Sequence, residues 1–272
     1  MFGKYHFLLF FGILIVLTGF SQPSILPFHS GEKLYYDVSY NWHFVWVNAG
    51  KVEFQVDSTM YGERPAWHFK SSGRSLSSYD WIFKVRDKFE SVADANTFQP
   101  YWFVRKTREG SYFVDNKLNF DYENHRIISQ LETSRKPYRK DTIPLNPLYL
   151  DLQTAVYFAR TLDFSNMEIN DKIPFYVLID GEKFELFGRY LGKEIIKNRD
   201  GKSYKCHKFS ALLVEGTMFK GGEDLFVWVT DDRNKIPILA EAKILVGSVK
   251  AWFTGGENLK YPMESIIVEE RF

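Results

Sequence analysis

Cysteine is almost absent from this 272-residue chain, whose single thiol belongs to Cys206. One cysteine cannot form an internal disulfide. Residues 203–209 are typical of a strand, in which Cys206 and its neighbour His207 point to opposite faces. We therefore expect a buried, unreactive thiol rather than a nucleophile beside its base. Because a lipoprotein needs a cysteine directly after its cleaved signal, and Cys206 is far from that place, lipid anchoring is also excluded.

Motifs that carry catalysis or bind metals are missing as well. The sequence contains no H-E-x-x-H, no C-x-x-C, no phosphate-binding Walker loop and no G-x-S-x-G. Beyond residue 21, no two histidines are three or four positions apart, so no local zinc site is visible. Adjacent acids such as Asp231 and Asp232 suit a solvated turn. The sequence thus predicts no catalytic residue, no metal site and no cofactor, and it leaves open whether the protein is an enzyme.

A strong net charge is also lacking. Lysine and arginine number 35 and aspartate and glutamate 34, which gives a formal net charge of +1 at pH 7. Loss of Lys4 with the first 21 residues would leave the chain neutral. This balance argues against nucleic acid as a partner, and against docking on anionic lipid through overall charge.

Long apolar runs are confined to the beginning of the chain. Lys4 precedes an apolar run at residues 7–17, and Gly19 and Ser21 are the small residues that a signal peptidase reads. The sequence predicts a signal peptide at residues 1–21, cleaved after Ser21, and export to the periplasm. A retained membrane anchor is the alternative, although the run is short for a spanning helix. Residues 22–30, with two prolines, are predicted to be a linker.

Aromatic residues, by contrast, make up 18% of the chain, and this bias favours strands. Residues 223–230 and 236–253 form the clearest strand pair, joined by a charged turn, with Gly247 as a bulge or bend. Asp180 and Gly181 mark another hairpin. Short strands at this spacing predict an all-β, mainly antiparallel fold. We expect a curved sheet or open barrel, in a single β-rich domain of residues 31–272.

One α-helix is expected to pack on this sheet, at about residues 150–162. Asp151 can accept hydrogen bonds from the first free backbone amides and so cap the helix. The apolar stripe that would face the sheet consists of Leu152, Ala155, Val156 and Ala159.

Residues 79–90 show the most regular alternation of the chain. This pattern predicts a strand and explains Trp81 as a core residue. Asp87 interrupts the apolar face, whose members are Trp81, Phe83, Val85 and Phe89.

Three stretches, residues 42–47, 101–104 and 225–229, are apolar on both faces. A helix of about 12 residues is only about 18 Å long and cannot cover all of them. Either the sheet closes on itself, or an apolar cleft is left for a ligand. In the second case Trp102 and Trp228 are the predicted ligand-binding residues, because their flat rings suit lipid tails or sugar rings.

Several segments together resemble the bacterial family called domain of unknown function 3108 (DUF3108), whose members are exported. The resemblance rests on residues 31–36, 48–50, 150–160, 227–232, 236–237 and 246–247. It implies a mostly antiparallel, strongly curved sheet that is similar to the open barrels of periplasmic lipoprotein carriers. The serine and tyrosine of the family's helix look like Thr154 and Tyr157 here. Since the family has no known activity, the resemblance implies no catalytic residue.

These observations lead to three hypotheses about function. The first is a non-catalytic envelope protein that binds an apolar or amphiphilic molecule, such as a lipid, in a cleft of the curved sheet. The second is an assembly or interaction protein of the envelope, with a protein partner and no small ligand. The third is a hydrolase that acts on envelope glycans or lipids, which would require converging acids or a serine–histidine pair in a cleft.

Overall fold

The computed structural model describes residues 26–42, 45–213, 222–243 and 247–268. Within these residues the chain forms strands, one α-helix, α1 (Leu152–Thr161), and a single turn of 3₁₀-helix, Ser77–Tyr79. The strands are β1 (Glu32–Trp42), β2 (Val45–Tyr61), β3 (Arg64–Ser75), β4 (Arg86–Asp94), β5 (Pro100–Glu109), β6 (Tyr112–Asp121), β7 (Arg126–Thr133), β8 (Lys136–Pro144), β9 (Lys172–Ile179), β10 (Glu182–Lys197), β11 (Ser203–Leu213), β12 (Gly222–Thr230), β13 (Pro237–Lys243), β14 (Ser248–Glu257) and β15 (Ile266–Ile267).

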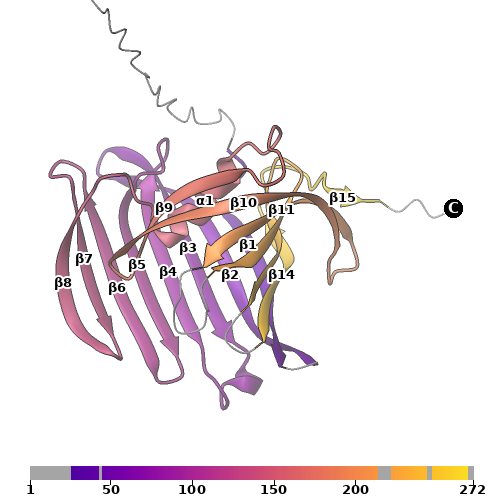
Figure 1. Cartoon of the computed structure of the whole chain (residues 1–272), viewed down its shortest axis with the longest axis horizontal. Helices are drawn as coiled ribbons and strands as arrows, with labels where there is room; N and C mark the ends of the chain where they lie inside the picture. Colours follow the sequence, from indigo (N-terminus) through magenta and orange to yellow (C-terminus); the bar gives the residue numbers. More distant parts are fainter. Residues whose placement is uncertain (1–25, 43–44, 214–221, 244–246, 269–272) are drawn as a thin grey trace, which may run out of the picture.

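The strands form one sheet in which all paired neighbours are antiparallel (Figure 1). Its order is β8-β7-β6-β5-β4-β3-β2-β1-β14-β13-β12-β11-β10-β9, and β15 pairs with β11. Most neighbours in space are therefore neighbours in sequence, and the β1–β14 pair joins the two halves of the chain. The expected all-β, mainly antiparallel open sheet with one packed helix is confirmed.

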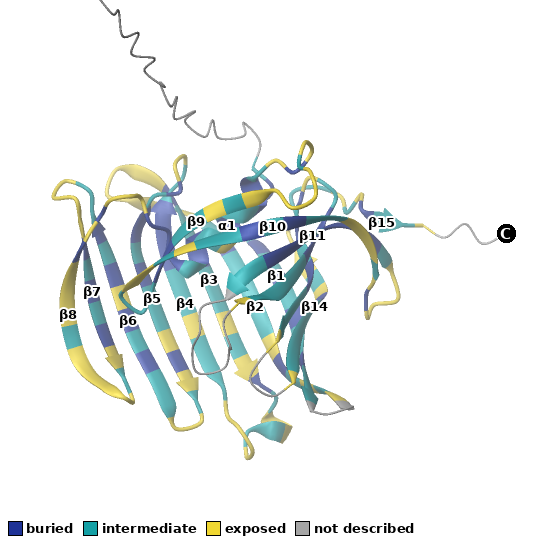
Figure 2. Ribbon diagram, viewed as in Figure 1, coloured by how far each residue is buried: buried dark blue, intermediate teal, exposed yellow. Residues whose placement is uncertain are grey.

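The sheet curls until its two ends approach each other on the inner side (Figure 1). Leu178 of edge strand β9 is fully buried in a cluster with Phe103, Leu118 and Ile143, which belong to β5, β6 and edge strand β8. Side-chain packing thus brings the edges together without a ladder of backbone hydrogen bonds between them. We call the side that carries α1 and the β9–β10 hairpin the inner face; buried and exposed positions alternate along the strands (Figure 2).

The helix begins as predicted, but it buries a different face. Asp151 caps it by accepting hydrogen bonds from the amides of Gln153 and Thr154, both at 2.9 Å. Val156, assigned to the apolar stripe, is exposed. The buried residues are Gln153, Thr154, Tyr157, Arg160 and Thr161. The predicted stripe is wrong because polar partners inside the fold satisfy these side chains, and because Tyr157 stacks on Phe69 with ring centroids 4.3 Å apart.

Two strand predictions also need correction. Residues 79–90 do not form one strand: β4 begins only at Arg86, and Trp81 is exposed on a connecting turn. Residues 236–253 form parts of two strands, β13 and β14, and not one. Gly247 lies at their turn with a φ of +84°, where a Cβ would meet the backbone oxygen of Asn41 at 2.1 Å. Gly247 is thus required at the turn itself.

The predicted signal peptide, residues 1–21, lies outside the described residues. The last part of the predicted linker, residues 26–30, is packed against the fold. Phe28 is fully buried between Trp67, Phe69 and Tyr157, with ring centroids 5.3–6.1 Å away. Among the described residues, no helix has the length and apolar character that crossing a membrane requires.

Candidate functional site

A single row of side chains crosses the inner face from β3 to β8, directly beneath α1 and the β9–β10 hairpin. Opposite positions in antiparallel strands share a face. The strand register places one residue of each strand, from β3 to β8, opposite a residue of the next strand. We call this set the inner row; its members are Ser71, Phe89, Arg105, Asn116, Leu131 and Arg139. The row mixes apolar rings and chains with charged and amide groups, and therefore presents an amphiphilic strip toward the interior.

The β9–β10 turn is held on this row by an ion pair. Arg105 Nη1 donates to Asp180 Oδ1 at 3.0 Å and to Oδ2 at 3.2 Å, and Arg139 Nη2 donates to the Asp180 backbone oxygen at 3.3 Å. A Cβ at Gly181 would lie 3.2 Å from the Ser129 hydroxyl, so glycine permits the close approach. The turn that the sequence predicted thus closes over β5, β7 and β8.

The helix contacts the other end of the row. Ser71 Oγ donates to Gln153 Oε1 at 2.8 Å, which aligns the Gln153 amide above β3. The Gln153 Nε2 group is buried and has no hydrogen-bond partner among the described residues. One buried donor is therefore left unpaired where the helix meets the inner row.

Asn116 is the most unusual member of the row. Its side chain is 2% exposed, and neither its amide oxygen nor its amide nitrogen has a hydrogen-bond partner in the described part of the chain. Leaving a buried polar group unpaired costs about 1–3 kcal/mol, and native proteins contain few such groups. The side chain lies on β6 between Arg105 and Leu131, where its Nδ2 is available to donate to a bound polar group and its Oδ1 to accept from one.

Two carboxyl groups lie close to Arg105. Burial raises the pKa of Asp87, whose Oδ1 accepts a hydrogen bond from the Arg108 amide at 3.1 Å. Burial, reinforced by the charge of Asp87, raises the pKa of Glu109, and Arg105 opposes both shifts. Asp87 and Glu109 are thus partly shielded from water, and the two carboxyl groups share the positive charge of Arg105.

The two tryptophans that the sequence predicts as ligand-binding residues lie in separate clusters. Trp102 pairs with Val92 on the outer face and packs near Ala66, Val92 and Tyr101, its ring centroid 5.6 Å from that of His68. Trp228 is almost fully buried, and its Nε1 donates to Glu194 Oε2 at 2.9 Å. The structure does not bring the two indoles together, and their role in ligand binding stays a prediction.

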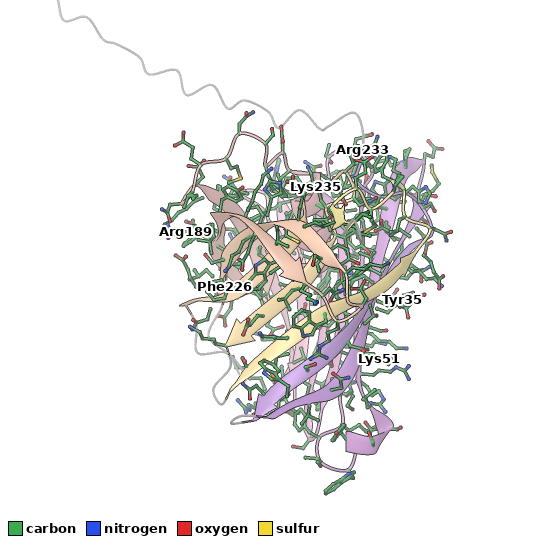
Figure 3. The ribbon with its side chains drawn as sticks, turned by 90° about the vertical axis from the view of Figure 1, so that its right-hand side faces the viewer. Tyr35, Lys51, Arg189, Phe226, Arg233 and Lys235 are labelled. Carbon is green, nitrogen blue, oxygen red and sulfur yellow. The ribbon has the colours of Figure 1, made fainter. Side chains whose placement is uncertain are left out.

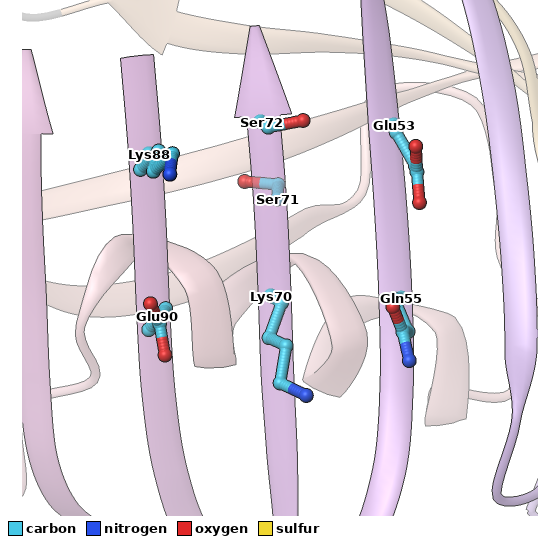
Figure 4. Close-up of a pocket in the computed structure, with 7 residues that line it drawn as sticks. All are labelled: Glu53, Gln55, Lys70, Ser71, Ser72, Lys88 and Glu90. Atoms are coloured by element: carbon cyan, nitrogen blue, oxygen red, sulfur yellow. The ribbon is translucent and has the colours of Figure 1, made fainter.

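Among the described residues, shallow hollows open on the outer face, and polar and charged residues make up most of the lining of the two described here. The smaller, of about 150 Å³, crosses β2, β3 and β4, with α1 behind the strands (Figure 4). Its walls are Glu53, Gln55, Lys70, Ser71, Ser72, Lys88 and Glu90. The larger, of about 510 Å³, lies over β5–β8 beside the exposed Tyr138, and its lining includes Arg105 and Asn116 of the inner row. Their charges of both signs are typical of a solvated sheet face.

The single cysteine and the histidine beside it are both engaged or buried in the described part of the chain. His207 Nδ1 contacts the Tyr190 hydroxyl at 3.1 Å, and Nε2 contacts Asp231 Oδ1 at 2.8 Å, so both ring nitrogens are engaged. Cys206 is buried, as expected, and burial raises the pKa of its thiol to about 12. No group of three or more metal-binding side chains occurs in the part of the chain described.

Sequence reasoning missed the inner row, although β6 carried a signal for it. The inward positions of that strand are Val114, Asn116, Leu118 and Phe120, all buried, and Asn116 is the one polar residue in the series. The interruption by Asp87 was visible, but its partners could not be named from the sequence. Arg105 and Asp180, 75 residues apart, are brought together only by the curl of the sheet.

Comparisons with known proteins bear on the fold and the family. The fold is similar to that of a beta-barrel-like DUF1849 protein from Brucella abortus, with a TM-score of 0.53 and 9% identity over 86% of this chain and 98% of that one. A putative exported protein with a YmcC-like fold from Bacteroides fragilis gives a TM-score of 0.36 and 7% identity, over 85% of this chain and 98% of that one. No curated protein matches the chain.

The family match covers most of the sequence. Residues 35–254 match the model described as "Protein of unknown function (DUF3108)". This segment includes β2–β13 whole, with α1 and the entire inner row. It also agrees with the resemblance inferred from the sequence segments. The chain therefore belongs to the DUF3108 family.

Proposed function

We propose that this protein is a non-catalytic, exported envelope protein that binds an amphiphilic molecule on the inner row. Asn116 would hydrogen-bond the polar group of the ligand, while Phe89 and Leu131 would contact its apolar part. The single observation that carries the proposal is the buried Asn116 amide, with both of its atoms unpaired among the described residues.

The charges around the row favour an uncharged polar group on the ligand. Arg105 and Arg139 are already engaged by Asp180, and Asp87 and Glu109 add negative charge nearby. A phosphate or carboxylate would be repelled by these acids, while the guanidinium groups of Arg105 and Arg139 already donate to Asp180. An amide or hydroxyl group can both donate to and accept from Asn116. The proposed ligand class is thus a lipid-like molecule with a neutral, hydrogen-bonding head.

The test compares two asparagines on the same strand. Asn116→Leu removes the unpaired amide from the inner face, and Asn119→Leu makes the same change on the outer face, where Asn119 lies opposite Trp102. Native mass spectrometry of protein recovered from its own envelope fraction should detect a bound molecule in the parent. We expect at least about a tenfold loss of occupancy in Asn116→Leu and little change in Asn119→Leu.

Stability separates this role from a structural one. Because the Asn116 side chain makes no hydrogen bond to the described residues, its replacement should leave the urea midpoint unchanged or raise it. An unliganded parent, or equal occupancy in both variants, would rule out the ligand-binding proposal. The second hypothesis, an envelope assembly protein with a protein partner, would then replace it.

Export is the second part of the proposal, and it rests on Lys4, the apolar run and the Gly19-x-Ser21 pattern. The intact mass of the protein recovered from the periplasm is expected to begin at Gln22. Full-length chain retained in the membrane would contradict this cleavage.

A further inference from the structure

The connection between β3 and β4 presents three consecutive bulky apolar side chains to solvent. Trp81 is 83% exposed, Ile82 60% and Phe83 48%. The connection protrudes at the lower end of the molecule in Figure 1, beyond the ends of its strands. We call residues 81–83 the apolar tip. Exposed apolar residues that adjoin one another, unlike scattered ones, mark contact sites.

The tip is held in place from within. The amides of Ile82 and Phe83 both donate to the Tyr79 oxygen, at 2.9 and 3.1 Å. The indole Nε1 of Trp81 donates to the Ser78 oxygen at 3.0 Å. Because the indole N–H of Trp81 is already hydrogen-bonded, the ring can enter an apolar medium without leaving this donor unpaired.

An ion pair fixes the base of the tip. Arg86 Nη2 donates to Asp80 Oδ2 at 2.6 Å, and its Nη1 reaches both Asp80 Oδ1 and the Ser75 hydroxyl at 3.1 Å. The side chain of Phe83 lies against Gly110, where an added Cβ would meet the ring at 3.1 Å. The tip is thus a preorganised projection, which lowers the entropy lost on docking.

Cations lie on the outer face of the strands that adjoin the tip. Lys51 lies opposite Arg74, Arg74 lies opposite Arg86, and Lys88 lies opposite Lys106. Figure 3 shows Lys51 directed away from the sheet. Arg74, Lys84, Lys88 and Lys106 are exposed and form no ion pair with any carboxylate among the described residues. The chain is nearly neutral overall, and although Lys51 and Arg86 pair with Asp37 and Asp80, these four unpaired cations leave an excess of positive charge among the residues named here.

We propose that the apolar tip inserts into the interface of an anionic membrane, with the surrounding cations on the lipid headgroups. Tryptophan is enriched at membrane–water interfaces, and lysine and arginine near an anionic surface are attracted to it. A protein partner would need a surface of about 800 Å² on this side of the interface, whereas the tip is a narrow projection of three side chains. The inference goes beyond ligand binding and does not depend on it.

The experiment measures co-sedimentation with vesicles, using protein recovered from the exported fraction. One set of vesicles contains phosphatidylcholine and phosphatidylglycerol in equal parts, and the other contains phosphatidylcholine alone. We expect binding to the anionic set, weakened by salt. The double variant Trp81→Ser/Ile82→Ser should bind at least about tenfold more weakly.

The matched control removes exposed apolar groups elsewhere. Ile169 and Ile195 are 65% and 62% exposed, and these exposed fractions are similar to that of Ile82. The variant Ile169→Ser/Ile195→Ser should therefore bind like the parent. A third variant, Trp81→Phe, should retain binding but lose part of the tryptophan quenching by brominated lipid, since Trp81 would no longer be the inserted indole. Asn116→Leu should bind vesicles normally, which keeps this test independent of the ligand site.

Three outcomes would overturn the proposal: no binding of the parent to anionic vesicles, equal loss in the tip and control variants, or quenching that is unchanged in Trp81→Phe. Absence of vesicle binding would instead assign the tip to a protein partner. Urea unfolding of each variant checks for misfolding, which we do not expect in the tip and control variants because Trp81, Ile82, Ile169 and Ile195 are all largely exposed.

Discussion

Replacement of Glu32 by alanine is expected to destabilise the protein by about 3–5 kcal/mol. Glu32 is fully buried and forms a two-pronged ion pair with Arg160 of the helix, at 2.6 and 3.1 Å. Arg160 is almost fully buried as well, and it also donates to the Asn234 oxygen at 2.9 Å. Without Glu32, a buried guanidinium loses its counter-charge and cannot regain water. The free energy of unfolding in urea measures the effect.

Two further variants test the explanation. Glu223→Ala breaks a similar two-pronged ion pair, in which Arg189 donates to Glu223 at 2.7 and 2.8 Å. Because this pair is only partly buried, its loss should lower the free energy of unfolding by no more than about 1 kcal/mol. The double variant Glu32→Leu/Arg160→Met should recover much of the loss, because no lone charge is left inside. A Glu32→Ala protein as stable as the parent would show that Arg160 finds water or another partner.

Asp151→Ala is expected to destabilise the protein by about 2–3 kcal/mol, more than the ~1 kcal/mol of a cap alone. Asp151 is fully buried and accepts from Gln153 N, Thr154 N, Thr154 Oγ1 and Ser91 Oγ, at 2.7–2.9 Å. The Ser91 bond ties the helix to β4, so the substitution disrupts a tertiary contact together with the helix terminus. Asp151→Asn should lose less, because the amide oxygen keeps part of the cap.

The pH dependence of the same residue has a defined sign. Burial raises the pKa of Asp151, although its hydrogen bonds oppose the shift. The folded state thus binds the proton more tightly than the unfolded state does. The resulting stabilisation is present below the unfolded pKa and is lost as the pH rises through the higher folded pKa. As the pH rises from acidic to neutral, the free energy of unfolding of the parent should therefore fall relative to that of Asp151→Asn. A parallel profile for the two proteins would contradict the raised pKa.

Local sequence patterns predicted the parts of the fold that depend on neighbouring residues. The β-branched and aromatic run of β12, the Asp180–Gly181 turn and the Asp151 cap each depend on contacts within a few positions. Antiparallel strands joined by short turns follow from such signals. The family resemblance had the same origin, and the match over residues 35–254 confirms it.

The strand predicted at residues 79–90 shows where pattern alone misleads. Its apolar residues alternate as in a strand, but the Asp80–Arg86 ion pair holds the segment in a turn. Trp81, explained as core by that alternation, became the most exposed aromatic side chain among the described residues. Periodicity records which residues could share a face, and it does not record whether a neighbouring element covers that face.

The sequence alone therefore determined the all-β class, the helix and its cap, because these depend on short-range geometry. Tertiary structure decided which face of the helix is buried, since Glu32, 128 residues before Arg160 in the chain, makes that arginine an interior residue. It likewise assembled the inner row, because Arg105, Asn116 and Asp180 meet only after the sheet has curled. Burial and pairing of polar groups depend on partners distant in sequence, and no local pattern encodes those partners.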